Sequence, residues 1–102
     1  MTKPQVAQAI TAIVELDTPL KRGETEITEL TLRKPSAGEL RGTSLAEVMQ
    51  MQTDALFTLI PRISTPSLTA AEVQRMDPAD LVQCGSEITG FLLPKRAKGE
   101  TA

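Results

Sequence analysis

The sequence predicts an α+β fold, in which an N-terminal antiparallel β-hairpin is followed by three or four α-helices in a single small domain. The first third of the chain alternates apolar and polar residues and is rich in β-branched types, whereas helix-start signals recur in the rest. With 102 residues, 40% of them hydrophobic, the chain is too short for two independent cores. We therefore expect one domain over residues 10–93, between a flexible N-terminus at 1–9 and a basic disordered tail at 94–102.

The hairpin is expected to pair strands at residues 10–16 and 25–33 across a turn at 17–24. In the first strand, alternation places Ile10, Ala12, Val14 and Leu16 on one face. In the second strand, it places Thr28, Leu30 and Leu32 on one face and Ile27, Glu29, Thr31 and Arg33 on the other. A lone hairpin is marginal in water, so its apolar face must rest on the helices, or its edge must pair with another chain.

A strand–helix junction is predicted in the run LTLRKPSAGELRG at residues 30–42. Pro35 ends the extended segment because it lacks an amide hydrogen and disfavours helical angles at Lys34. Ser36 and Glu39, three residues apart, form a capping box that opens a helix.

The longest helix is expected from Leu45 to about Ile60, with Ser44 as its N-cap and with Pro61 ending or kinking it. Its apolar residues fall on one stripe at helical spacing, which Gln52 interrupts. The stripe comprises Leu45, Val48, Met49, Leu56, Leu59 and Ile60.

Two further helices follow a loop at residues 65–67. Thr69 and Glu72 form a capping box for a short helix that ends near Met76, with Leu68 and Val73 placed as a hydrophobic staple. Asp77 caps the last helix, Pro78 occupies its first position, and Pro94 ends it. The buried face of that helix is expected to carry Leu81, Cys84, Gly85, Ile88, Phe91 and Leu92.

The composition argues against catalysis. The chain has no histidine, and Cys84 is its only cysteine, so Ser–His and Cys–His arrangements and cysteine-based metal clusters are excluded. Asp77 and Asp80 are interpreted as first-turn residues that favour the helix dipole, and Cys84 as a core residue. The net charge of −2 predicts no nucleic-acid partner, and the sequence has no membrane-spanning run. We expect a cytoplasmic protein that is not an enzyme and needs no cofactor or metal.

With catalysis excluded, binding to another protein is the expected role. Four residues are candidates for partner binding: Met49, Met51, Phe57 and Arg62. Thioethers repack around varied partners. Met49 lies on the stripe, so core packing is the favoured interpretation for it, whereas Met51 and Phe57 lie off the centre of the stripe and are better surface candidates. Arg62 either meets carbonyl groups at a helix end or contacts a partner.

Three segments of the chain resemble a known family. The junction at residues 30–42, the run LIPRIS at 59–64 and the run MDPADL at 76–81 are similar, in order and spacing, to the phage tail assembly chaperones E, 41 or 14 of Mu-like and related contractile-tailed phages. The resemblance extends from about Ile10 to about Leu93. It implies a chaperone that binds the tape-measure protein, keeps it soluble and helps recruit tail-tube subunits. It also implies action in the host bacterial cytoplasm and absence from the mature virion.

Other interpretations remain open at this stage. A small dimeric regulatory or antitoxin-like module and a minor structural virion component are the alternatives, and a homo-oligomer is compatible with each of them. Members of the resembled family often have a longer product made by ribosomal frameshift, which a protein sequence does not reveal.

Overall fold

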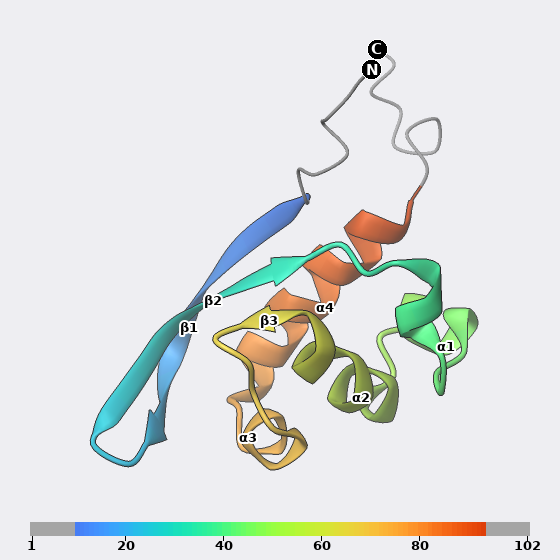
Figure 1. Cartoon of the computed structure of the whole chain (residues 1–102). Coiled ribbons are helices and arrows are strands. Elements are labelled where there is room, and N and C mark those ends of the chain that lie inside the picture. Colours follow the sequence, from blue (N-terminus) through green and yellow to red (C-terminus); the bar gives the residue numbers. More distant parts are fainter. Residues whose placement is uncertain (1–9, 94–102) are drawn as a thin grey trace.

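The computed structural model describes residues 10–93, and it confirms the α+β class with the hairpin at its N-terminal side. A long twisted hairpin lies against a group of helices, of which α4 (Pro78–Leu92) is the longest (Figure 1). The elements in order are β1 (Thr11–Arg22), β2 (Thr25–Arg33), the 3₁₀ helix η2 (Ala37–Leu40), α1 (Leu45–Met49), α2 (Thr53–Ile63), β3 (Ser64–Thr65), α3 (Ala70–Gln74) and α4 (Pro78–Leu92). The terminal segments expected at 1–9 and 94–102 lie outside the described residues.

The second strand has the expected bounds, but the first is longer than expected. β1 continues to Arg22, and the turn is confined to Gly23 and Glu24, where Gly23 adopts a φ of +62°. The expectation of a turn over 17–24 was wrong because the strand absorbs Asp17–Pro19 as an irregularity. The antiparallel register shifts between Glu15 and Leu20.

The register shift also changes which residues face the core. Leu30 and Leu32 are buried as one face of β2, but nearer the turn Ile27 is buried and Thr28 is exposed, which reverses the expected assignment of these two. Leu20 lies opposite Ile27 and is buried with it. The alternation of buried and exposed residues is broken here because β1 carries extra residues between Glu15 and Leu20.

On β1 the expected face is largely right. Val14 and Leu16 are buried and Ala12 is half-buried, but Ile10 is 56% exposed. Ile10 lies one residue before β1 begins, and the core does not reach it.

The expected long helix is two helices, α1 and α2, separated at Met51. Met51 has a φ of +57°, its N–H donates to the carbonyl of Val48, and the N–H of Gln52 donates to the carbonyl of Glu47. These two bonds make a Schellman motif with Met51 in the left-handed position. Because the break separates α1 from α2, the six residues of the expected stripe no longer share one face. Leu45 and Met49 are exposed. The other four are buried: Val48, Leu56, Leu59 and Ile60.

Pro61 neither ends nor visibly interrupts α2, which continues to Ile63. Pro61 lies in the last turn, and Ile60 and Ile63 on either side of it are both fully buried, so core packing holds this turn in place. Ser64 and Thr65 then form β3, which pairs antiparallel with Leu32 and Thr31 of β2. The sequence showed only a loop at this point.

The caps of the last two helices are confirmed. Thr69 and Glu72 form a capping box in which each residue's backbone N–H donates to the other's side chain, with Leu68 and Val73 buried beside it. Asp77 caps α4, and its carboxylate accepts the N–H of Ala79 at 2.9 Å. On the core side of α4, Cys84, Gly85, Ile88 and Phe91 are buried, and Leu81 and Leu92 are partly buried.

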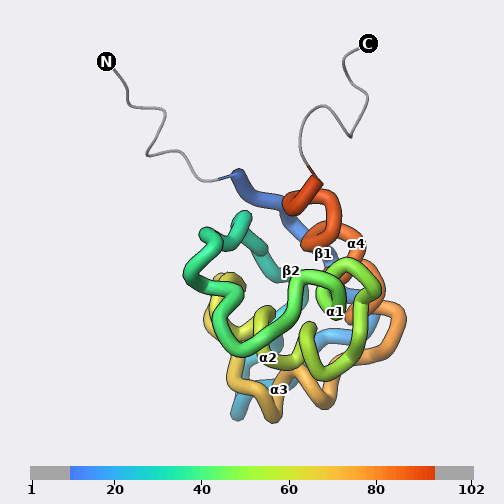
Figure 2. The backbone as a smooth tube through the Cα atoms, turned by 90° about the vertical axis from the view of Figure 1, so that its right-hand side faces the viewer, coloured from blue at the N-terminus to red at the C-terminus, as the bar shows by residue number. Residues whose placement is uncertain are grey.

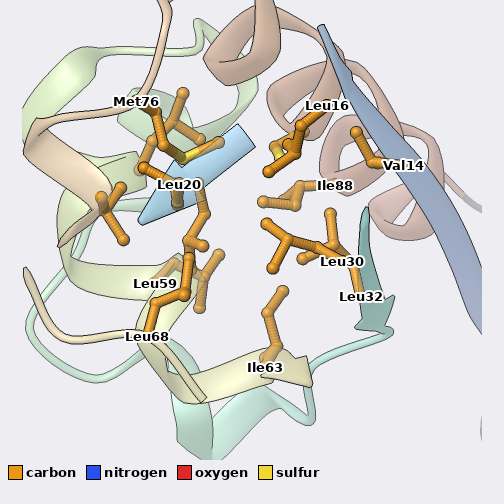
Figure 3. Packing of buried hydrophobic residues seen from close by; sticks show 14 of the residues in the cluster. Val14, Leu16, Leu20, Leu30, Leu32, Leu59, Ile63, Leu68, Met76 and Ile88 are labelled. Atoms are coloured by element: carbon orange, nitrogen blue, oxygen red, sulfur yellow. The ribbon is translucent and has the colours of Figure 1, made fainter. Parts of the chain in front are cut away.

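The core lies between the inner face of the hairpin and the helices. Figure 3 shows Val14, Leu16 and Leu30 from the strands facing Leu59, Ile63 and Ile88 from the helices. Figure 2, a view from the side of Figure 1, shows α1 beside α4, and these two helices are in contact. The core is almost wholly aliphatic, since Phe91 is its only buried aromatic among residues 10–93.

Candidate partner-binding surface

Two of the three family-like segments are joined to each other by arginines. The guanidinium of Arg33, at the end of β2, donates to the carboxylate of Glu39 in η2 and to the carbonyl of Arg62 at 3.0 Å. Glu39 also accepts the N–H of Ser36 at 2.9 Å, the reaching-back half of the expected capping box. The bond from Arg33, followed by the N–H of Ser36, lowers the pKa of Glu39 from its ordinary 4.5 to about 2.

Arg62 holds the same loop from the other side. One nitrogen of its guanidinium donates to the carbonyls of Glu39 and Arg41, at 2.7 and 2.6 Å. The sequence offered carbonyl groups at a helix end as one contact for Arg62. Arg62 does meet carbonyl groups, but they belong to Glu39 and Arg41 of the η2 segment and not to the end of α2. Arg62 thus has a structural role in holding the η2 loop, and its exposed guanidinium keeps its positive charge because its acceptors are neutral carbonyls.

The third family-like segment holds β1. Asp80 is fully buried, and its two carboxylate oxygens accept the N–H groups of Asp17 and Thr18, at 2.7 and 3.1 Å. Asp77 accepts the hydroxyl of Thr18 at 2.8 Å. The interpretation of Asp80 as only a first-turn charge was incomplete. The run Asp17–Pro19, which the sequence placed in a turn, is the irregular part of β1, and its N–H groups need such an acceptor.

The far end of the hairpin is fixed as well. The guanidinium of Arg22 donates to both carboxylate oxygens of Glu72, at 2.9 and 2.7 Å, and to the carbonyl of Ser67 at 2.8 Å. This bond and the N–H of Thr69 lower the pKa of Glu72 to about 2. The hairpin is therefore tied to η2, α4 and α3 along its length, and these polar groups are occupied within the fold.

A candidate surface for a partner is the outer side of α1. Leu45 and Met49 lie one helical turn apart and are 58% and 39% exposed, while Val48 between them is buried. Large apolar side chains exposed as neighbours are a marker of interaction sites. We call Leu45 and Met49 the α1 patch. The interpretation of Met49 as a core residue was wrong, because the break at Met51 turns the stripe.

The structure does not bring the four sequence candidates together. Met51 turns inward onto α4: a Cβ built on Gly85 would lie 2.8 Å from Cε of Met51. Phe57 is half-buried and packs against the core. Leu45, which the sequence assigned to the core, is the neighbour that joins Met49 on the surface.

Three features of the described residues concern metal binding, thiol reactivity and membrane insertion. Between residues 10 and 93, no group of three or more acidic or cysteine side chains is placed to hold a metal ion. The Cys84 thiol is buried, and burial, with the charges of Asp80 and Glu87, raises its pKa to about 12. No helix among these residues is long and apolar enough to cross a membrane.

Comparison with known proteins agrees with the resemblance of the three segments. A family model described as phage tail assembly chaperone proteins E, or 41 or 14, matches residues 13–93. Tail assembly protein E of Escherichia phage P2 is 48% identical over 82 residues, which cover 80% of this chain and 90% of the relative. Tail assembly protein E' of the same phage is 47% identical over 81 residues, 79% of this chain but only 57% of that longer relative. No solved structure matches.

Proposed function

This chain belongs to the family of phage tail assembly chaperone proteins E, 41 or 14, and we propose that its client is the tape-measure protein. In this proposal the chain binds apolar segments of the tape measure, keeps them soluble and helps recruit tail-tube subunits. It acts by binding alone, without catalysis or a cofactor. It works in the host bacterial cytoplasm and leaves before the virion is complete.

The observation that carries the proposal is the α1 patch. A chaperone for a long helical client needs an apolar surface that accepts many similar helix faces, and this is how amphipathic helices are commonly bound. Leu45 and Met49 supply such a surface on a short helix, and the flexible thioether of Met49 adapts to different side chains. Charged groups of the family-like segments pair within the fold, at η2 and β1, so in this proposal they stabilise the fold and the apolar α1 patch contacts the client.

The test is co-expression with the tape-measure protein encoded in the same genome, followed by pull-down and sizing of the soluble fraction. We expect the tape measure to be soluble only with this chain and to co-elute with several copies of it. Failure to associate, with the tape measure still aggregating, would overturn the proposal. Recovery of the chain in purified virions would instead favour a structural component.

A matched pair of variants locates the surface. Leu45→Glu places a charge in the α1 patch, whereas Ala46→Glu places the same charge on the neighbouring exposed residue of the same first turn. We expect Leu45→Glu to reduce tape-measure recovery at least tenfold, and Ala46→Glu to leave it within about twofold of the parent. Equal recovery with both variants would remove α1 from the binding surface.

A further inference from the structure

The outer edge of β1 has no strand beside it within residues 10–93. β2 lies between β1 and β3 in the sheet, so β1 is an edge strand. The N–H of Lys34 donates to the carbonyl of Ile10 at 2.8 Å, which fixes the phase of the antiparallel ladder. Since bonded and non-bonded pairs alternate, Thr11, Ile13 and Glu15 direct their backbone N–H and C=O groups outward, away from β2.

Toward the turn, three different features prevent another strand from pairing with this edge. The carboxylate of Asp80 takes the N–H groups of Asp17 and Thr18, and Pro19 has no N–H to offer. Lys21 and Arg22 follow with exposed side chains. Bound amides, proline and charge are the usual means by which proteins prevent strand addition.

Between Thr11 and Glu15 there is no proline and no amide bound by Asp80, and the one charged side chain is Glu15 at the end of the segment. The three side chains of the outward-bonding residues are exposed, and Ile13 is 61% exposed, the most of any large apolar side chain among residues 10–93. We call the segment Thr11–Glu15 the open edge. An unprotected edge bearing an exposed isoleucine is a template for another strand.

We infer that the open edge pairs antiparallel with the open edge of a second copy, in a symmetric dimer centred on Ile13. In this register Ile13 faces Ile13 of the second copy, and Thr11 faces Glu15, so no like charges are opposed. A register centred on Glu15 would bring the two carboxylates together, which is unfavourable. The register centred on Ile13 also uses the outward groups of all three residues.

The symmetry of such a pair is compatible with the rest of the fold. Its two-fold axis is perpendicular to the sheet, so both copies place α4 on one face and the Ile13 side chains together on the other. The two three-stranded sheets become continuous through β1. The inference does not depend on the proposed function, because it concerns the isolated chain.

Analytical ultracentrifugation of the purified full chain tests the inference. We expect a dimer of the 11.0 kDa chain to be populated at about 100 µM, the range in which weak contacts associate. Ile13→Pro removes one outward N–H without removing a β1–β2 bond, and we expect it to be monomeric with an unchanged circular dichroism spectrum. Ile13→Glu serves the same purpose if the proline variant does not fold. A monomeric parent, or a folded variant that remains dimeric, overturns the inference.

Cross-linking tests the register. Ile13→Cys places two thiols across the symmetry axis, and we expect at least tenfold faster disulfide dimer formation under mild oxidation than for Thr28→Cys. Thr28 is also exposed, but it lies on the central strand. Equal rates would show that any dimer uses another surface. Loss of tape-measure binding would leave this result unchanged, so the two proposals fail separately.

Discussion

The carboxylate of Asp80, in the first turn of α4, accepts the backbone N–H of Asp17 at 2.7 Å in the irregular part of β1. The side chain is fully buried, and its second oxygen accepts the N–H of Thr18. A buried carboxylate is costly unless its oxygens are bonded, and here two amides from another element bond them. One acidic side chain therefore fixes the crossing point between the hairpin and α4 and closes the outer edge of β1 beyond Glu15.

Replacing Asp80 by Asn should destabilise the protein by about 2–3 kcal/mol. Asn keeps one acceptor oxygen, but its NH₂ group then faces a backbone N–H, and that part-buried donor loses its partner. Urea unfolding checks this. Asp54→Asn, at an exposed first-turn position of α2, is the control and should change the free energy of unfolding by less than about 1 kcal/mol. Equal effects of the two changes would contradict the role of Asp80.

Stability should fall in acid through Glu39 and Glu72. Both have a pKa lowered from 4.5 to about 2, first by an arginine side chain and then by a backbone N–H. A carboxylate with a lowered folded-state pKa contributes stability that is complete above its unfolded pKa and is lost as the pH falls toward the folded value. The loss is therefore expected between pH 4.5 and about 2.

Variants of the Arg22–Glu72 pair isolate this effect. The stability difference between the parent and Glu72→Gln should be constant above about pH 5.5 and should shrink as the pH falls toward 2, because the parent carboxylate becomes protonated. Arg22→Gln removes the main cause of the shift and should flatten the pH dependence in the same way. A difference that stays constant down to pH 2 would contradict the assignment.

Arg62→Met should destabilise the protein by about 1–2 kcal/mol, because the carbonyls of Glu39 and Arg41 lose their donor while the aliphatic stem is kept. Arg41→Met, a change of the same kind at an exposed neighbour, should stay within about 0.5 kcal/mol. Thermal unfolding of both variants measures this. If Arg62→Met weakens client binding and leaves stability unchanged, then Arg62 belongs to the partner surface.

The features predicted correctly from the sequence are those made by residues close together in the chain. The capping box at Thr69, the cap at Asp77 and the bounds of β2 each depend on bonds or patterns spanning a few residues. The short strand β3 depends instead on a distant partner, and the break at Met51 combines local Schellman bonds with packing on α4. Met51 tolerates its left-handed backbone where it packs on Gly85, and β3 exists because Thr31 and Leu32 lie beside it.

The candidate surface was less predictable than the fold for the same reason. A continuous helix over residues 45–60 would have turned Met49 toward the core and left Met51 off the stripe. The break between α1 and α2 reverses both positions. A single residue in the left-handed region thus changes which side chains a partner can reach, and no local pattern around Met51 marks it, since glycine is the usual residue there.

Cys84 should be unreactive in the folded protein. Its thiol is buried and its pKa is raised to about 12, so almost no thiolate exists at pH 8. An aromatic disulfide reagent should label it at least a hundredfold more slowly than in 6 M urea, at a rate set by transient opening. Gln83→Cys, at an exposed position of α4, should add one rapidly labelled thiol. Rapid labelling of the parent would show that α4 leaves the core readily.

The two glycines of α4 offer a matched test of the packing beneath the α1 patch. A Cβ at Gly90 meets nothing within 4 Å, so Gly90→Ala should stabilise the helix by about 0.5–1 kcal/mol. A Cβ at Gly85 would lie 2.8 Å from Cε of Met51 and 3.2 Å from Cδ1 of Leu56. Gly85→Ala should therefore be less stable than Gly90→Ala by about 1 kcal/mol or more, since a close-packed core resists an added methyl group.

A double-mutant cycle assigns the cause of that difference. If Met51 makes the conflict, Met51→Ala should cost less in the Gly85→Ala background than in the parent, because the added methyl group fills part of the space that the thioether leaves. Urea unfolding of the four proteins gives the coupling free energy, expected at about 0.5–1 kcal/mol. Additive effects would mean that the side chain of Met51 and the space at Gly85 are not energetically coupled. The left-handed backbone at Met51 would then be held by the Schellman bonds alone.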